Sequence, residues 1–118
     1  MNIPTPPGVR LYMLDAEHHV VRCRDVIAWG RWMEDFDNRR VAYTDINVAI
    51  SVSTVFLGIN HRFGGRGPPL LFETMVFTNG DGGDMWRYSS WDDAAAGHEA
   101  AVRRLRAAQT TSELPVRD

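Results

Sequence analysis

Residues 48–59 read VAISVSTVFLGI, and residues 70–77 read LLFETMVF. In the first half of the earlier segment apolar residues alternate with small or polar ones, which is the period of a half-buried strand. From Val55 to Leu57 both faces become apolar, as expected for a strand covered on both sides. The later segment is the next strand, and the two ought to be neighbours in one sheet.

Upstream of these strands, Val9–Leu14 alternates well enough to form a first strand, and residues 15–17 close it as a turn. Residues 18–23 leave two alternatives open, a returning strand or the approach to a helix. Arg40–Asp45 is predicted to form a short strand.

Between these segments the sequence predicts a helix from an N-cap at Asp25 to about Phe36. Its apolar residues recur on one helical face. They are Val26, Trp29, Met33 and Phe36. The cluster from Asp35 to Asn38 is expected to end the helix, and Asn38 is able to adopt a left-handed conformation there.

Downstream, residues 79–83 predict a turn and Trp86–Ser89 a last short strand. Ser90 then caps a helix that runs to about Ala108, with acidic residues in its first turn. The apolar stripe of this helix consists of Trp91, Ala94, Ala95, His98, Ala101, Val102 and Leu105.

These elements define an α+β fold, a three- to four-stranded, mostly antiparallel sheet with two helices packed on it. We expect a flexible lead-in over residues 1–8, one domain over residues 9–108 and a frayed tail over residues 109–118. A chain of 118 residues is the size of one domain.

Composition narrows the function classes. The formal net charge is −2, so no basic field indicates nucleic-acid binding. No apolar run reaches the length of about 20 residues that a membrane helix needs, and the N-terminus lacks the order of a signal peptide. Cys23 is the only cysteine, which is consistent with a reducing cytoplasm. We therefore expect a cytoplasmic protein that binds neither membranes nor nucleic acid.

Three segments of the chain form a pattern that is found elsewhere. They are residues 53–65 (STVFLGINHRFGG), 67–77 (GPPLLFETMVF) and 87–91 (RYSSW), followed by Ala94, Ala96, Gly97 and His98. This pattern resembles that of a family of small, functionally unannotated proteins encoded by bacteriophages and prophages. The resemblance covers roughly residues 9–105 and departs from the family pattern at Arg66 and Ser90. It implies a phage setting, including interference with host defence, and no particular activity.

Glu73 lies on the same strand face as Leu71, Met75 and Phe77, where an unpaired carboxylate is costly. His98 falls within the apolar stripe of the last helix. If that helix packs on this strand face, a Glu73–His98 pair satisfies both side chains. Such a pair is structural, binds a ligand or serves catalysis, and the sequence leaves these three uses open.

A weaker metal hypothesis adds His61 to Glu73 and His98, because these residue types suit a divalent ion. Their spacing matches no ligand signature. We expect neither a metal nor a cofactor.

The loop from Asn60 to Pro69 is longer than a hairpin needs, and such loops commonly carry binding sites. We predict polar contacts from His61, Arg62 and Arg66. Trp32 or Trp86 would add an apolar anchor.

The favoured function is a non-enzymatic phage or prophage accessory protein that binds a host protein or a small ligand. One alternative is a small hydrolase or nucleotide-binding protein that uses Glu73 and His98. Another is an oligomeric or virion component, suggested by the doubly apolar residues 55–57.

Overall fold

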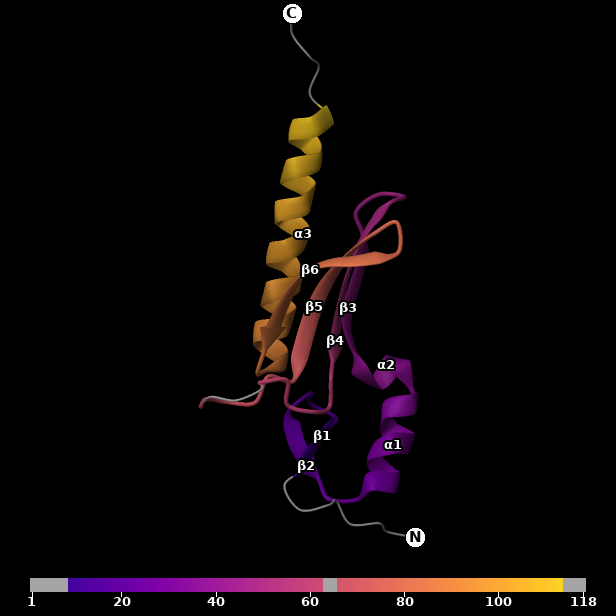
Figure 1. Ribbon diagram of the computed structural model, residues 1–118, viewed down its shortest axis with the longest axis vertical. Helices are drawn as coiled ribbons and strands as arrows, with labels where there is room; N and C mark the ends of the chain where they lie inside the picture. The colour runs from indigo at the N-terminus through magenta and orange to yellow at the C-terminus, as the bar shows by residue number, and fades with distance from the viewer. Residues whose placement is uncertain (1–8, 63–65, 114–118) are drawn as a thin grey trace, which may run out of the picture.

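The structure is a computed structural model that describes residues 9–62 and 66–113. It confirms the α+β class, with a four-stranded and a two-stranded antiparallel sheet and helices packed against them (Figure 1). The predicted lead-in, residues 1–8, lies outside the described residues, as do residues 63–65 of the predicted loop and residues 114–118 of the predicted tail.

The small sheet pairs β1 (Leu11–Leu14) with β2 (Val20–Cys23). Residues 18–23 therefore contain the returning strand, one of the two alternatives that the sequence leaves open. An isolated β-bridge between Leu11 and Ile59 connects this small sheet to the four-stranded sheet. Ile59 lies just after β4 (Ile50–Phe56), the second strand of that larger sheet.

The predicted helix is divided into α1 (Val26–Glu34) and α2 (Phe36–Arg39). Asp25 caps α1 as predicted, because its carboxylate accepts hydrogen bonds from the amides of Ile27 and Ala28 at 3.0 and 3.3 Å. Asp35 interrupts the helix in an extended conformation and caps α2.

Asn38 does not adopt the left-handed conformation that is open to it. It lies within α2 and has no left-handed backbone, and its side-chain amide donates to the carbonyl of Trp32 at 2.9 Å. This bond joins the two short helices across the break at Asp35.

The main sheet has the order β3 (Arg40–Asp45), β4 (Ile50–Phe56), β5 (Phe72–Thr78) and β6 (Asp81–Tyr88). A two-residue turn, Asn79-Gly80, joins β5 to β6, and both residues have the positive φ that such hairpin turns require (52° and 85°). The turn is thus shorter than predicted, and the last strand begins at Asp81 instead of Trp86.

Register differs between the inner and outer strands. β4 and β5 pair without a shift from Ile50↔Thr78 to Phe56↔Phe72. The pairing of β3 with β4 shifts between Arg40 and Ala42, and the pairing of β5 with β6 shifts between Met75 and Phe77. Both irregularities involve an outer strand.

α3 (Trp91–Glu113) lies along one face of the main sheet (Figure 1). Ser90 caps it as predicted, accepting from the amide of Asp93 at 3.1 Å. The helix continues past Ala108, where the sequence predicts its end. Within the described residues, no helix has both the length and the apolar character needed to cross a membrane.

The core lies between α3 and this face of the sheet. Gly97 allows α3 to pack closely against β6, since a Cβ atom at that position would overlap the ring of Tyr88. The buried apolar side chains of this layer are Val52, Phe56, Phe72 and Val76 from the sheet and Ala94, Ala101 and Val102 from α3.

Candidate functional site

The predicted Glu73–His98 pair is wrong. Glu73 is opposite Val55 and Arg87 in the sheet, and its carboxylate accepts from Arg87 Nε at 3.1 Å. Its neighbours Phe72 and Thr74 point the other way, toward α3, because successive residues of a strand alternate between faces. His98 projects from α3 onto that second face, so the sheet separates the two side chains.

His98 instead belongs to a buried polar network. Its ring nitrogens lie 2.8 Å from Thr54 Oγ1 and 2.9 Å from Thr44 Oγ1, and Thr54 is hydrogen-bonded to Thr74 at 2.6 Å. Burial lowers the pKa of His98 below its ordinary value of 6.5, and the nearby charge of Glu99 opposes this shift. The neutral ring satisfies its hydrogen bonds within the core, which is a structural role.

The three residues of the metal hypothesis lie apart. Glu73 and His98 occupy opposite faces of the sheet, and His61 Nδ1 lies 2.8 Å from the carbonyl oxygen of Ile59 in the loop. These positions give no common ligand set.

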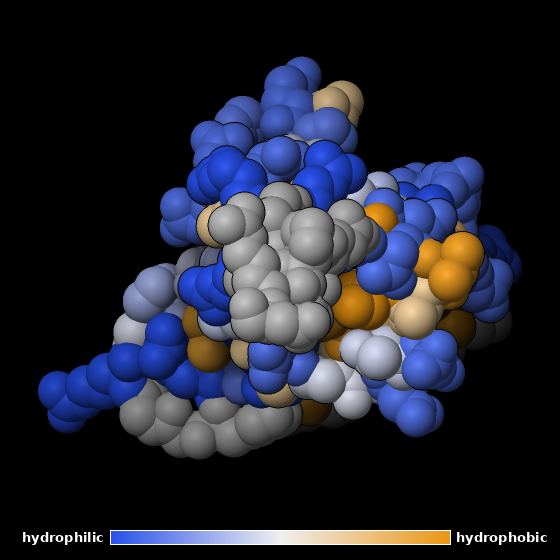
Figure 2. All heavy atoms as spheres, turned by 90° about the horizontal axis from the view of Figure 1, so that it is seen from above, coloured by the Kyte–Doolittle hydropathy of each residue, from blue (hydrophilic) through white to orange (hydrophobic). Residues whose placement is uncertain are grey.

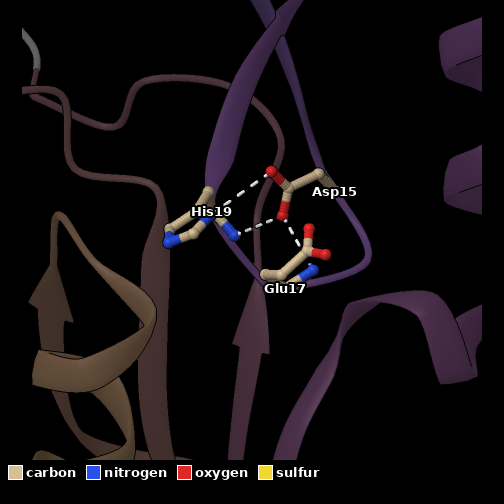
Figure 3. A group of neighbouring side chains, drawn as sticks. All are labelled: Asp15, Glu17 and His19. Carbon is tan, nitrogen blue, oxygen red and sulfur yellow. Dashed lines mark hydrogen bonds and ion pairs between the residues drawn. The ribbon is translucent and has the colours of Figure 1, made fainter.

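A different group of potential ligands lies in the turn between β1 and β2, where Asp15, Glu17 and His19 are gathered (Figure 3). Asp15 Oδ1 accepts from the amides of Glu17 and His19 at 2.9 and 2.8 Å. The hydrogen bond from the His19 amide is the main cause that lowers the pKa of Asp15. The carboxylate therefore closes the turn, as predicted for residues 15–17.

Several polar groups of the predicted binding loop form hydrogen bonds with other groups of the same loop. Asn60 Oδ1 accepts from the amides of Arg62 and Leu70, each at 2.8 Å, and Arg62 Nε donates to the carbonyl of Pro68 at 3.0 Å. Arg66 is exposed. Of the predicted contact residues in this loop, Arg66 is the one whose side chain extends most freely into solvent.

The two predicted tryptophan anchors are half-buried. Trp32 packs edge-on against Phe56, with 5.7 Å between ring centroids, and so belongs to the core. Trp86 lies under the guanidinium of Arg104, 5.4 Å from the ring centroid, in a groove of about 190 Å³ between β6 and α3.

Polar and apolar side chains lie together on the face of the main sheet that α3 leaves uncovered, here called the open face. Register places its side chains in three rows that cross the four strands. The first row is Arg40, Val55, Glu73 and Arg87, the second is Tyr43, Ser53, Met75 and Met85, and the third is Asp45, Ser51, Phe77 and Gly82.

The open face exposes large apolar side chains at its edges. Tyr43 on β3 is 48% exposed and Met85 on β6 is 42% exposed, while Met75 and Phe77 between them are half-buried. Arg40 stacks on the Tyr43 ring, 5.5 Å from its centroid. The face thus offers an apolar middle row next to a row of charges, a surface suited to contact with another molecule.

A hollow of about 450 Å³ lies at the end of the open face, beside the turns β3–β4 and β5–β6. Tyr43, Asp45, Ser51 and Phe77 line it together with residues of the two turns. The sequence analysis does not single out these residues. The available signal is Ser51 and Ser53 alternating with Val52 and Thr54, because small polar residues along an inner strand indicate a face without a helix.

A scan against protein-family models, a search of curated proteins and a search of solved structures each find no match to this chain.

Proposed function

We propose that this chain is a phage- or prophage-encoded accessory protein that acts in the cytoplasm of the bacterial host by binding a host protein. Its contact surface is the open face of the main sheet. The observation that carries this proposal is the mainly apolar row Tyr43, Ser53, Met75 and Met85, in which Tyr43 and Met85 are exposed, on a sheet whose other face is filled by α3.

The open face replaces the loop as the favoured surface. The amide of Asn60 and the guanidinium of Arg62 form hydrogen bonds within the loop, and such groups must lose those bonds to contact a partner. Tyr43 and Met85 are already exposed and lie on rigid strands. A tyrosine ring has few rotatable bonds and loses little conformational freedom on binding, and a methionine side chain adapts its shape to a partner, so both residue types suit a contact surface.

The hydrolase alternative loses its basis, because Glu73 and His98 lie on opposite sides of the sheet. The oligomer alternative keeps a specific support, because an apolar sheet face also fits a second copy of the chain. Light scattering of the purified protein separates these cases, since a stable dimer at micromolar concentration favours the second copy.

Affinity capture with matched variants tests the proposed surface. Met85→Glu places a charge in the apolar row, Arg103→Glu changes an exposed residue of α3, and Arg66→Ala tests the loop. We expect the wild type, Arg103→Glu and Arg66→Ala to retain one host protein from bacterial lysate and Met85→Glu to lose it at least tenfold. Equal capture by Met85→Glu, or loss with Arg66→Ala alone, would place the site elsewhere.

A further inference from the structure

The hollow at the end of the open face has a defined shape. Asp45, Ser51 and Phe77 stand in one row across three adjacent strands, so Asp45 and Phe77 are two strand spacings, or about 9.5 Å, apart. Ser51 between them is short and leaves the space open. Tyr43 flanks the same space from the neighbouring row.

The charge of this hollow is negative. Asp45 is the one ionisable carboxylate among its lining residues, and the row neighbours of Asp45 are neutral. Asp45 Oδ1 accepts from the Tyr43 hydroxyl at 2.9 Å, and within residues 9–62 and 66–113 no basic group forms an ion pair with this carboxylate. A carboxylate in a hollow that two aromatic rings also line is suited to a cation.

The walls of the hollow are held in place before any ligand arrives. Asn47 Oδ1 accepts from the amides of Ala49 and Ile50, each at 2.8 Å. The amide of Asn79 donates to the carbonyl of Ala49 at 2.7 Å, which ties the two turns together. A preorganised site requires less ordering when it binds.

Figure 2 shows the molecule from above, which is the end at which both turns lie in Figure 1. In this view hydrophobic side chains are exposed among hydrophilic ones. The hollow is continuous with the apolar row, because Tyr43 belongs to both. A partner that covers the row therefore reaches the hollow with the same surface.

We propose that the hollow binds an arginine side chain of the partner protein, with the guanidinium paired to Asp45 and stacked against Phe77, because Arg40 of this chain already lies over the Tyr43 ring. This inference rests on the proposed function, because it takes the partner to lie on the open face. Arginine fits better than lysine, since its planar group stacks on aromatic rings and pairs with a carboxylate at the same time.

The test is a titration of the full chain with N-acetyl-arginine amide, followed by the backbone amide signals of Ser51 and Gly80 in NMR spectra. N-acetyl-citrulline amide, which is neutral and has nearly the same shape, is the matched control ligand. We expect saturable shifts in the millimolar range with arginine and at least tenfold weaker binding with citrulline.

Two variants sharpen the titration. Asp45→Asn should weaken arginine binding at least tenfold, whereas Asp84→Asn removes a charge from β6 outside the hollow and should leave it unchanged. Phe77→Leu keeps an apolar wall without the ring and should weaken binding severalfold. Asp45 is exposed, and an unchanged spectrum of Asp45→Asn outside the hollow verifies that the variant is folded.

The outcomes separate this inference from the proposed function. Equal binding of arginine and citrulline, or full binding by Asp45→Asn, overturns the arginine site even if Met85→Glu abolishes capture of a host protein. Saturable, Asp45-dependent binding supports the site even if capture fails. A dimer that Asp45→Asn dissociates would assign the arginine to a second copy and overturn its assignment to a partner protein.

Discussion

One face of the β3–β6 sheet packs against α3, and the other is bare. On the covered face, Val52, Thr54, Phe56, Phe72 and Thr74 are fully or almost fully buried, and even the polar groups are hydrogen-bonded to each other. On the open face, large apolar side chains stay partly exposed beside charged ones. The same strands supply both faces, so one side of the sheet carries a closed core while the other leaves apolar side chains at the surface.

The largest expected difference between the faces is in the cost of removing an aromatic ring. Phe56→Ala on the covered face should lower the free energy of unfolding by about 3–5 kcal/mol, because it leaves a cavity in a closed core. Phe77→Ala on the open face should cost less, since Phe77 is only half-buried and no helix closes a core over it. Urea denaturation of both variants measures this, and equal losses would show that the open face is also part of the core.

The second prediction concerns pH and the covered face. Because burial lowers the pKa of folded His98 below its unfolded value of 6.5, the unfolded chain binds more protons at lower pH. His98 therefore favours folding above pH 6.5, and this contribution is lost as the pH falls, by up to about 1.4 kcal/mol per pH unit.

Urea midpoints between pH 7.5 and 5 should show this loss in the wild type and a flatter profile in His98→Gln. His19→Gln, which changes an exposed imidazole in the β1–β2 turn, is the matched control and should follow the wild type. An NMR titration that places the pKa of His98 at or above 6.5 would contradict the assignment of a neutral, sealed ring.

The smallest expected effect belongs to the charged row of the open face. Glu73→Gln removes the carboxylate that forms an ion pair with Arg87. The Glu73 side chain is 15% exposed and the Arg87 side chain is 27% exposed. Partly exposed pairs of this kind contribute about 1 kcal/mol or less, so we expect a shift in the melting temperature of only a few degrees. A loss as large as that of Phe56→Ala would mean that Glu73 has a structural role similar to that of His98.

Local sequence patterns predict most of the helices and strands. They do not predict which face of β5 packs against α3. In LLFETMVF both faces are largely apolar, so alternation alone does not decide whether Phe72 and Thr74 or Glu73 and Met75 lie under α3. The decision is tertiary, because Thr54 is hydrogen-bonded to His98 of α3 and Thr74 is hydrogen-bonded to Thr54 on the same face. The orientation of this strand rules out the predicted Glu73–His98 pair. It also places Glu73 and Met75 on the open face, where the new candidate site lies.

The candidate site itself depends on register. Asp45 and Phe77 are 32 positions apart in the sequence, and they share a row only because β4 pairs with both of their strands. Nothing in the local pattern of either strand places them together. The caps at Asp25 and Ser90, by contrast, depend on residues a few positions away, and the sequence predicts both correctly.

The register shifts at the two outer strands have a consequence for the behaviour of the protein at high concentration. A regular outer strand offers a straight row of unpaired amides and carbonyls, to which strands of other molecules can add. Shifts at β3 and β6 bend and twist both borders, whereas the inner pair β4–β5 remains regular. Irregular edges of this kind disfavour the addition of a further strand, and so they discourage fibril growth from the borders of the sheet.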